Sequence, residues 1–156
     1  MTPWRGRCCA LAVVLAGAVT AFSGSPLLAD EPAVYSMAGI AISGYDPVAY
    51  FTEGRPVRGN ARHALMWRGT TWYFASEENL LAFEMNPEAF APQYGGYCAM
   101  AVSRGTIAAT MPEAFRIVDG KLYLNNSMQV LNIWAKDAGG NITKANEQWP
   151  AVLGKN

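Results

Sequence analysis

Apolar and polar positions alternate most clearly in two parts of the chain, and each part has the form of a β-hairpin. His63–Trp67 and Thr70–Phe74 flank a tight turn at Arg68-Gly69, and the second run is rich in β-branched and aromatic residues. Further along, "FRIVDGKLYL" places Asp119-Gly120 between two alternating segments, which is a strong signal for a two-residue hairpin loop. The pattern therefore predicts two antiparallel hairpins.

Helix signals are interspersed with these hairpins. Ser76 is a favourable N-cap for the stretch "EENLLAFEMN", and Pro87 ends that helix and starts a second short turn. Near the C-terminus the pattern predicts two helices, over 127–137 and 141–149, separated by Gly139-Gly140. We therefore predict a single α+β domain in which short helices pack on a small antiparallel sheet of hairpins.

The segment before the first hairpin is shorter and less regular. Gly39–Ser43 predicts a short strand, and Asp46-Pro47 has the residue types preferred at an N-cap and a first helical position, with Gly54 placed to end the helix. Tyr97–Val102 is compatible with either helix or strand. We find no internal repeat, linker or low-complexity tract.

The N-terminal residues have the layout of a secretory signal peptide. Arg5 and Arg7 precede an uncharged apolar run, Cys8–Phe22, and small residues lead to a cleavage site after Ala29. The run is short for a membrane helix, which needs about 20 apolar residues, so an uncleaved anchor is the alternative. We expect a periplasmic or secreted protein with no membrane span after residues 1–29 are removed.

Charge and cysteine content narrow the function classes. Cleavage removes two of the 12 Lys and Arg, which leaves ten against 12 Asp and Glu, and no basic stripe is present. Nucleic acid is therefore not an expected partner. Cleavage also leaves Cys98 as the single cysteine, which in an oxidising compartment is buried and inert, bonded to a partner, ligated to a metal or reactive.

Three stretches, "GYDPVAYF", "WRGTTWYFASEENLLAFEMNPEAFAPQYGGYCA" and "VDGKLYLN", resemble YHS domain proteins, and most closely a secreted bacterial subgroup described as YHS domain (seleno)proteins. The resemblance runs from about Gly44 to Trp149 and implies a small α+β fold. We accordingly divide the chain into a signal peptide (1–29), an N-terminal extension (30–43), a YHS-like domain (44–150) and a C-terminal tail (151–156).

The resemblance implies a metal site only in part. YHS and related domains usually carry metal-binding thiols in a D-P-V-C knuckle and a Y-F-C-S-x-x-C segment, and the matching positions here are Ala49, Ala75 and Asn79. The usual thiolate site is therefore not expected in this chain. Some relatives carry selenocysteine at the position of Cys98, which implies redox or metal chemistry there.

Cys98 has three interpretations: a buried structural residue, a reactive thiol and a metal ligand. Met100 and His63, which is the one imidazole in the sequence, complete with it a donor set suited to copper. On a strand, Cys98 and Met100 point to the same face, whereas on a helix they diverge. Core packing for the methionine and a solvated surface position for the histidine are the alternatives.

Aromatic residues indicate another kind of site. Tyr45, Asp46, Tyr50 and Tyr97 are candidates for lining a binding cleft, although core burial is the usual role of such tyrosines and an N-cap also explains Asp46. The sequence contains no paired carboxylates, no Ser/His/Asp order and no phosphate-binding glycine loop. We therefore do not expect an ordinary hydrolase, and we favour a binding protein over an enzyme.

The favoured hypothesis is a YHS-type binding protein that handles a soft metal ion, copper first, through Cys98. Two alternatives stay open: a thiol-dependent redox protein in which Cys98 reacts, and an adaptor whose aromatic cleft binds a small molecule or a protein. They differ in what surrounds the sulfur. The first predicts converging soft donors, the second an exposed sulfur, and the third a buried sulfur without donors.

Overall fold

The computed structural model describes Met1 and residues 31–154, so residues 2–29 of the predicted signal peptide lie outside the described residues. The predicted α+β class is confirmed, with small sheets and short helices. One sheet has the order β1 (Ser36–Met37), β2 (Ile40–Ala41), β4 (Thr70–Phe74) and β3 (Asn60–Trp67), and a second pairs β5 (Met111–Val118) with β6 (Lys121–Asn125). No helix in the described part of the chain is long and apolar enough to cross a membrane.

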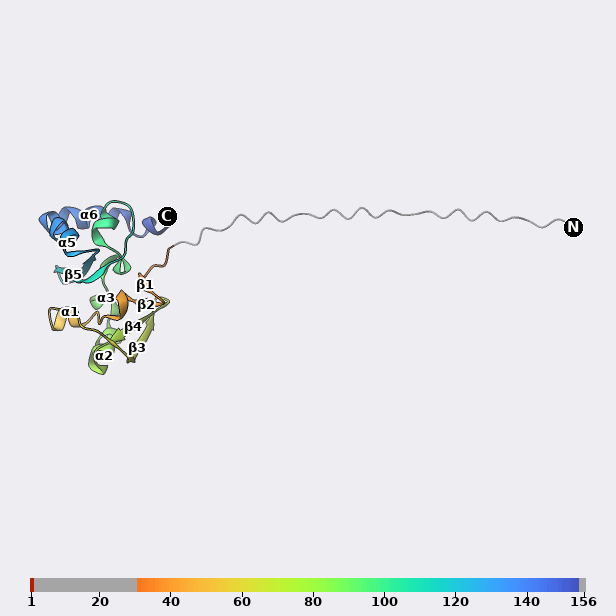
Figure 1. Cartoon of the computed structure of the whole chain (residues 1–156), viewed down its shortest axis with the longest axis horizontal. Helices are drawn as coiled ribbons and strands as arrows, with labels where there is room; N and C mark the ends of the chain where they lie inside the picture. Colours follow the sequence, from red (N-terminus) through yellow and green to blue (C-terminus); the bar gives the residue numbers. More distant parts are fainter. Residues whose placement is uncertain (2–30, 155–156) are drawn as a thin grey trace.

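Six α-helices are described: α1 (Ala49–Thr52), α2 (Glu77–Met85), α3 (Pro87–Phe90), α4 (Ala99–Ser103), α5 (Met128–Trp134) and α6 (Ala138–Gln148). The first sheet and α2 form the lower half of the molecule in Figure 1, and β5, α5 and α6 form the upper half. The segment left open between helix and strand, Tyr97–Val102, is helical from Ala99 onward.

Two boundary predictions are wrong for local reasons. The Gly139-Gly140 pair does not separate two helices but lies in the first turn of α6, where the Asp137 side chain accepts a hydrogen bond from Gly140 N–H at 3.0 Å. This cap stabilises a helix start that the glycines alone disfavour. The strand predicted over Gly39–Ser43 shrinks to β2, because the chain turns at Ile42–Gly44 in a 3-10 helix with positive φ angles.

The core consists of two hydrophobic clusters that share one strand. Trp72, Phe74 and Phe83 are buried in the lower cluster, whereas Tyr123 and Trp134 are buried in the upper one. Strand β6 contributes to both, because its successive side chains point to opposite faces and Leu122 and Leu124 belong to the lower cluster. The two halves of the molecule are therefore packed as one domain.

The two hairpins have the same hydrogen-bonding register. In the first, Asn60 pairs with Phe74, a bulge follows, and pairing resumes until Trp67 and Thr70. In the second, Met111 pairs with Asn125, a bulge of the same length follows, and pairing ends at Val118 and Lys121. Each position in the second hairpin lies 51 residues after its counterpart in the first.

The elements on either side of the hairpins repeat as well. A serine caps the helix after each hairpin: Ser76 accepts from Asn79 N–H, and Ser127, 51 positions later, accepts from Val130 N–H, both at 3.2 Å. Before each hairpin the chain makes an unusual turn with three successive positive φ angles. These are 40°, 56° and 79° at Ile42–Gly44, and 55°, 59° and 84° at Tyr94–Gly96.

The sequence-based statement that the chain contains no internal repeat is therefore wrong. We call the two copies unit 1 (residues 42–85) and unit 2 (residues 94–134). When the hairpin and capped helix of unit 1 are compared with those of unit 2, three pairs of residues are identical: Gly69/Gly120, Ser76/Ser127 and Leu80/Leu131. Turn, cap and core positions fix the backbone, while the other positions have diverged too far for the repeat to be visible in the sequence.

The segments predicted as extension and tail both supply core side chains. Val34 is buried in the lower cluster, and Val152 and Leu153 are buried in the upper one. The extension runs so close to unit 2 that a Cβ at Gly95 would lie 1.9 Å from the Ala33 carbonyl oxygen. Only glycine fits at that crossing.

Candidate functional site

The Asp46 carboxylate is the centre of a buried network in unit 1. The residue is 0 % exposed. One oxygen, Oδ1, accepts hydrogen bonds from Val48 N–H (2.8 Å) and Ala49 N–H (3.3 Å). The other, Oδ2, accepts from Ala75 N–H (2.8 Å) and the Asn79 side-chain amide (2.7 Å). The carboxylate thus ties the start of α1 to the turn between β4 and α2.

The residues at the positions where the YHS resemblance would place thiols take part in this network. The three matching positions, Ala49, Ala75 and Asn79, are all direct hydrogen-bond partners of Asp46. Hydrogen bonds to a charged group are each worth about 1.5–3 kcal/mol. The prediction of an N-cap at Asp46 is wrong in position, because α1 begins at Ala49 with Val48 as its N-cap residue, although Asp46 Oδ1 does accept from the N–H groups at that helix start.

Cys98 is the counterpart of Asp46 in unit 2. Gly44-Tyr45-Asp46 and Gly96-Tyr97-Cys98 follow the same turn in the two units. The backbone contact that follows is also the same: Asp46 N–H donates to Val57 C=O at 2.8 Å, and Cys98 N–H donates to Ala108 C=O at 3.0 Å. A thiol therefore occupies the place that a structural carboxylate occupies in the other unit.

Asn125 takes over part of the carboxylate's role in unit 2. Its Oδ1 accepts from Met100 N–H at 3.3 Å and lies 3.8 Å from Cys98 Sγ. The residue is 0 % exposed, and its Nδ2 has no acceptor among the described residues. Leaving such a donor unpaired costs about 1–3 kcal/mol. At the matching position unit 1 has the apolar Phe74, so the buried polar group follows the turn in unit 1 and lies at the end of the second hairpin strand in unit 2.

Because Asn125 Oδ1 accepts from Met100 N–H, the Cys98 side chain does not have to cap the start of α4, and its thiol donates to the same oxygen at 3.8 Å. Cys98 is 2 % exposed and lines a surface pocket of about 220 Å³. The pocket is lined by Cys98, Met100, Ala101, Arg104, Thr106, Ala108, Asn126 and Val130. Ala101, Asn126 and Val130 are the counterparts of Ala49, Ala75 and Asn79, which bond to Asp46 in unit 1. The pocket therefore lies at the position in unit 2 that Asp46 and its partners fill in unit 1.

The predicted metal ligands are only partly brought together. Cys98 and Met100 border the same pocket although they lie at the start of a helix. His63 is half-buried in β3 of unit 1 and does not line this pocket. Within residues 31–154, no group of three or more His, Cys, Asp or Glu side chains is arranged to hold a metal ion. The pocket therefore offers two soft donors, a thiol and a thioether.

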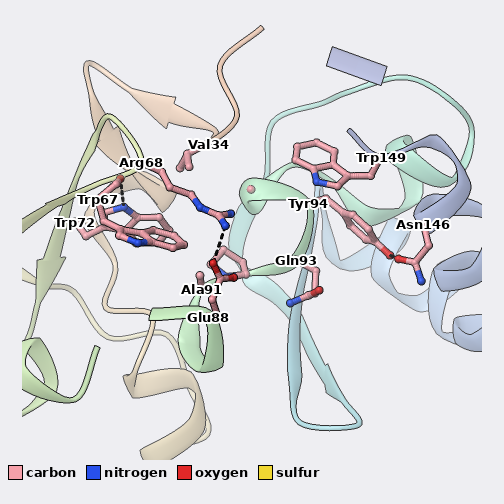
Figure 2. A pocket seen from close by; sticks show the side chains of 12 residues that line it. Val34, Trp67, Arg68, Trp72, Glu88, Ala91, Gln93, Tyr94, Asn146 and Trp149 are labelled. Carbon is pink, nitrogen blue, oxygen red and sulfur yellow. Dashed lines mark hydrogen bonds and ion pairs between the residues drawn. The ribbon is translucent and has the colours of Figure 1, made fainter. Parts of the chain in front are cut away.

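A second cleft lies between the two halves of the molecule and has a volume of about 210 Å³ (Figure 2). On one side the Arg68 guanidinium lies over the Trp67 ring, 4.5 Å from its centroid, and pairs with Glu88 at 2.6 Å. On the other side Tyr94 O–H donates to Asn146 Oδ1 at 3.0 Å. The cleft combines aromatic walls with polar groups that are already paired with one another.

The four residues predicted to line an aromatic cleft do not line the cleft of Figure 2. Asp46 and Tyr50 are fully buried, and Tyr50 O–H donates to Pro112 C=O at 3.1 Å, which connects unit 1 to β5. Tyr45 packs under the Arg58 guanidinium, 4.8 Å from the ring centroid. Tyr97 O–H donates to Pro32 C=O at 2.9 Å. Tyr97 also lines a separate surface pocket beside Pro32 and Tyr35, so the four predicted residues do not share one cleft.

Burial raises the pKa of several tyrosines above the usual 10.0. For Tyr50 the removal of water is the main cause, and the negative charges of Glu113 and Asp46 add to it. For Tyr94 burial is again the main cause, followed by Tyr123. Both hydroxyls therefore stay protonated and keep their hydrogen bonds at neutral pH.

Comparison with known proteins finds one similarity, which lies mainly in unit 1. The family model of the YHS domain matches residues 48–94, which confirms the predicted resemblance over that segment. The chain has no significant match among curated proteins or among solved structures. The match ends at Tyr94, where unit 2 begins, so it covers unit 1 from Val48 onward and leaves both Asp46 and Cys98 outside. Membership of the secreted (seleno)protein subgroup stays a prediction.

Proposed function

We propose that this protein is a periplasmic or secreted YHS-type binding protein that takes a soft metal ion, copper first, at the pocket of Cys98 and Met100. One observation carries the proposal: a free thiol and a thioether border the same surface pocket. Thiolate and thioether ligands select Cu(I) among the common metal ions. The YHS class, which is often linked to metal handling, supports the same interpretation.

Unit 1 is not the metal site in this proposal. Its equivalent position is closed by Asp46, whose two oxygens are already occupied by four hydrogen-bond donors. Oxygen ligands are also poorly matched to Cu(I). The ligand therefore binds in unit 2, where the site is open and the donors are sulfur atoms.

The test is a Cu(I) titration against a chromophoric chelator, with the full chain carrying Cys8→Ser and Cys9→Ser so that Cys98 is the one thiol. We expect one copper ion per chain, loss of binding in Cys98→Ser, and at least about tenfold weaker binding in Met100→Leu, since each tenfold step is 1.4 kcal/mol. His63→Ala is the matched control and should bind as the parent does. Chelator that retains all copper in the presence of the parent protein would remove the proposal and favour thiol reactivity.

A further inference from the structure

The two units hold different chemical groups in the same backbone frame. In unit 1 the frame surrounds a carboxylate, which is an anion with two oxygens, and each oxygen accepts two hydrogen bonds. In unit 2 the frame surrounds the Cys98 thiol, which has no oxygens. The N–H groups of Met100, Ala101 and Asn126 are the counterparts of the backbone donors of Val48, Ala49 and Ala75.

Unit 2 also contains a buried hydrogen-bond donor that has no acceptor among the described residues. The Asn125 amide lies against Cys98, with Oδ1 3.8 Å from the sulfur, while Nδ2 is buried and has no acceptor in the described part of the chain. Nearly all buried polar groups in proteins have a partner, so an unpaired one beside a thiol calls for an explanation. In the reduced protein Oδ1 faces the sulfur and accepts from the Cys98 thiol, so rotation of the amide would turn Nδ2 toward an oxygen added to the sulfur and supply the missing acceptor.

We propose that Cys98 is an oxidation site at which hydrogen peroxide converts the thiol to a sulfinate that reproduces the Asp46 carboxylate in unit 2. A cysteine sulfinate and an aspartate both carry two oxygens and one negative charge on the atom bonded to Cβ. The pocket gives a molecule of the size of peroxide access to the sulfur. Arg104, which also lines the pocket, adds a positive charge that favours an anionic product.

The oxidation takes place in two steps, and each step consumes one hydrogen peroxide and releases one water. The sulfur attacks one oxygen of the peroxide, an S–O bond forms as the O–O bond breaks, and the departing hydroxide takes up the thiol proton and leaves as water. Sulfur is oxidised by two electrons and one peroxide is reduced, which gives the sulfenic acid. A second peroxide repeats the step and gives the sulfinic acid, which ionises to the sulfinate.

The frame of unit 2 explains why oxidation should stop at two oxygens. Two oxygens would find the backbone N–H groups of Met100, Ala101 and Asn126 together with the Asn125 amide, which replaces the Asn79 amide of unit 1, while a third oxygen would have no equivalent place. The inference does not depend on copper, since it concerns the metal-free thiol, and the experiments below contain no metal. Their failure would leave the copper proposal standing, and failure of the copper titration would leave this one standing.

The first experiment treats the folded full chain with hydrogen peroxide and follows tryptic peptide 69–104, which contains Cys98, Met85 and Met100. Met85 is 87 % exposed and serves as an internal clock for peroxide exposure. We expect Cys98 to gain two oxygens, and no third, by the time Met85 has gained one. A thiol still reduced at that time, a reaction that stops at one oxygen, or a sulfonate as the main product would each overturn the proposal.

The second experiment tests the frame without any oxidation. Cys98→Asp introduces the group that the oxidised cysteine would mimic, and Cys98→Asn is the uncharged control of the same shape. We expect Cys98→Asp to have the higher midpoint of thermal unfolding, because the frame supplies donors for both carboxylate oxygens. An aspartate variant that unfolds below the asparagine variant, or that does not fold, would show that unit 2 does not receive an anion.

Discussion

Unit 1 and unit 2 use the same backbone for opposite purposes. In unit 1 the frame is closed, because Asp46 is fully buried and its carboxylate is bonded to four donors from three parts of the unit. In unit 2 the frame is open, because Asn125 has taken over the contact with Met100 and Cys98 borders a pocket. The same backbone arrangement thus holds a fully bonded carboxylate in unit 1 and a thiol beside a pocket in unit 2.

The difference between the copies lies in which strand carries the polar group. Unit 1 has a carboxylate at the turn and Phe74 at the end of β4, whereas unit 2 has a thiol at the turn and Asn125 at the end of β6. One buried polar group satisfies the helix start in each case. With Asn125 on the strand as the acceptor for the helix start, the residue after the turn does not need to be an acceptor, and a cysteine can occupy that position.

The largest expected effect comes from removing the closing group of unit 1. Asp46→Ala leaves two or more buried N–H donors without acceptors, at about 1–3 kcal/mol each, so we expect a loss of at least about 3 kcal/mol in unfolding free energy. The matched change in unit 2, Cys98→Ala, removes one sulfur atom beside an existing pocket and should cost about 1 kcal/mol. Urea unfolding of both variants measures the comparison.

Equal losses of unfolding free energy in Asp46→Ala and Cys98→Ala would contradict the comparison, since both side chains would then contribute equally to stability. A larger loss for Cys98→Ala would reverse it. Wild-type protein and Asp46→Asn complete the series. The asparagine keeps one acceptor, so its stability should fall between those of the parent and the alanine variant.

Where the units agree, matched changes should have matched effects. Ser76→Ala and Ser127→Ala each remove an N-cap hydrogen bond of 3.2 Å, and we expect each to lower the unfolding free energy by about 1 kcal/mol. Thermal or urea unfolding checks this. Replacement by Asp, which also caps helices well, should restore most of the loss in both units. A loss confined to one serine would indicate that the two capped helices are not equivalent.

The smallest expected effect is a change in stability at high pH that depends on Tyr50 and Tyr94. The pKa values of Tyr50 and Tyr94 are raised in the folded protein, so above about pH 10 the unfolded chain loses protons that the folded chain retains. The unfolding free energy should therefore fall as the pH rises above 10.0, and these two groups should cause no change below that value. Urea midpoints recorded across this range test the direction.

The double variant Tyr50→Phe/Tyr94→Phe is the control for that experiment. It should be somewhat less stable at neutral pH, because the bonds to Pro112 and Asn146 are lost, and its stability should vary less above pH 10. An unchanged pH profile in the double variant would assign the effect to other groups.

The local features of the fold are readable in the sequence because they depend on neighbours along the chain. Asp119-Gly120 and Arg68-Gly69 adopt the positive φ angles that tight hairpin turns require, and both hairpins are found where the alternation predicts them. Ser76 caps α2 as its residue type suggests. The start of α6 was predicted wrongly because Asp137 stabilises it across a glycine pair that, read alone, predicts a break.

The site was only partly predictable, since it is made by contacts across long stretches of sequence. Cys98 is identified as the central residue by elimination, because leader cleavage would leave it as the one cysteine. Asn125, 27 positions away, carries no sequence signal beyond being a polar residue at the end of an apolar strand. His63 resembles a ligand in composition but lies in the other unit, away from the pocket.

The sequence by itself determined the class of fold, the two hairpins and the serine-capped helices, because periodicity, turn residues and caps act over a few neighbouring positions. It also carried the resemblance of residues 48–94 to the YHS domain. Only the tertiary structure showed that the chain repeats itself. The register and the backbone angles of the two units are shared while almost every side chain differs, since packing constrains the backbone more strongly than it constrains residue identity. The equivalence of Asp46 and Cys98 follows from that shared backbone and from nothing in their chemistry.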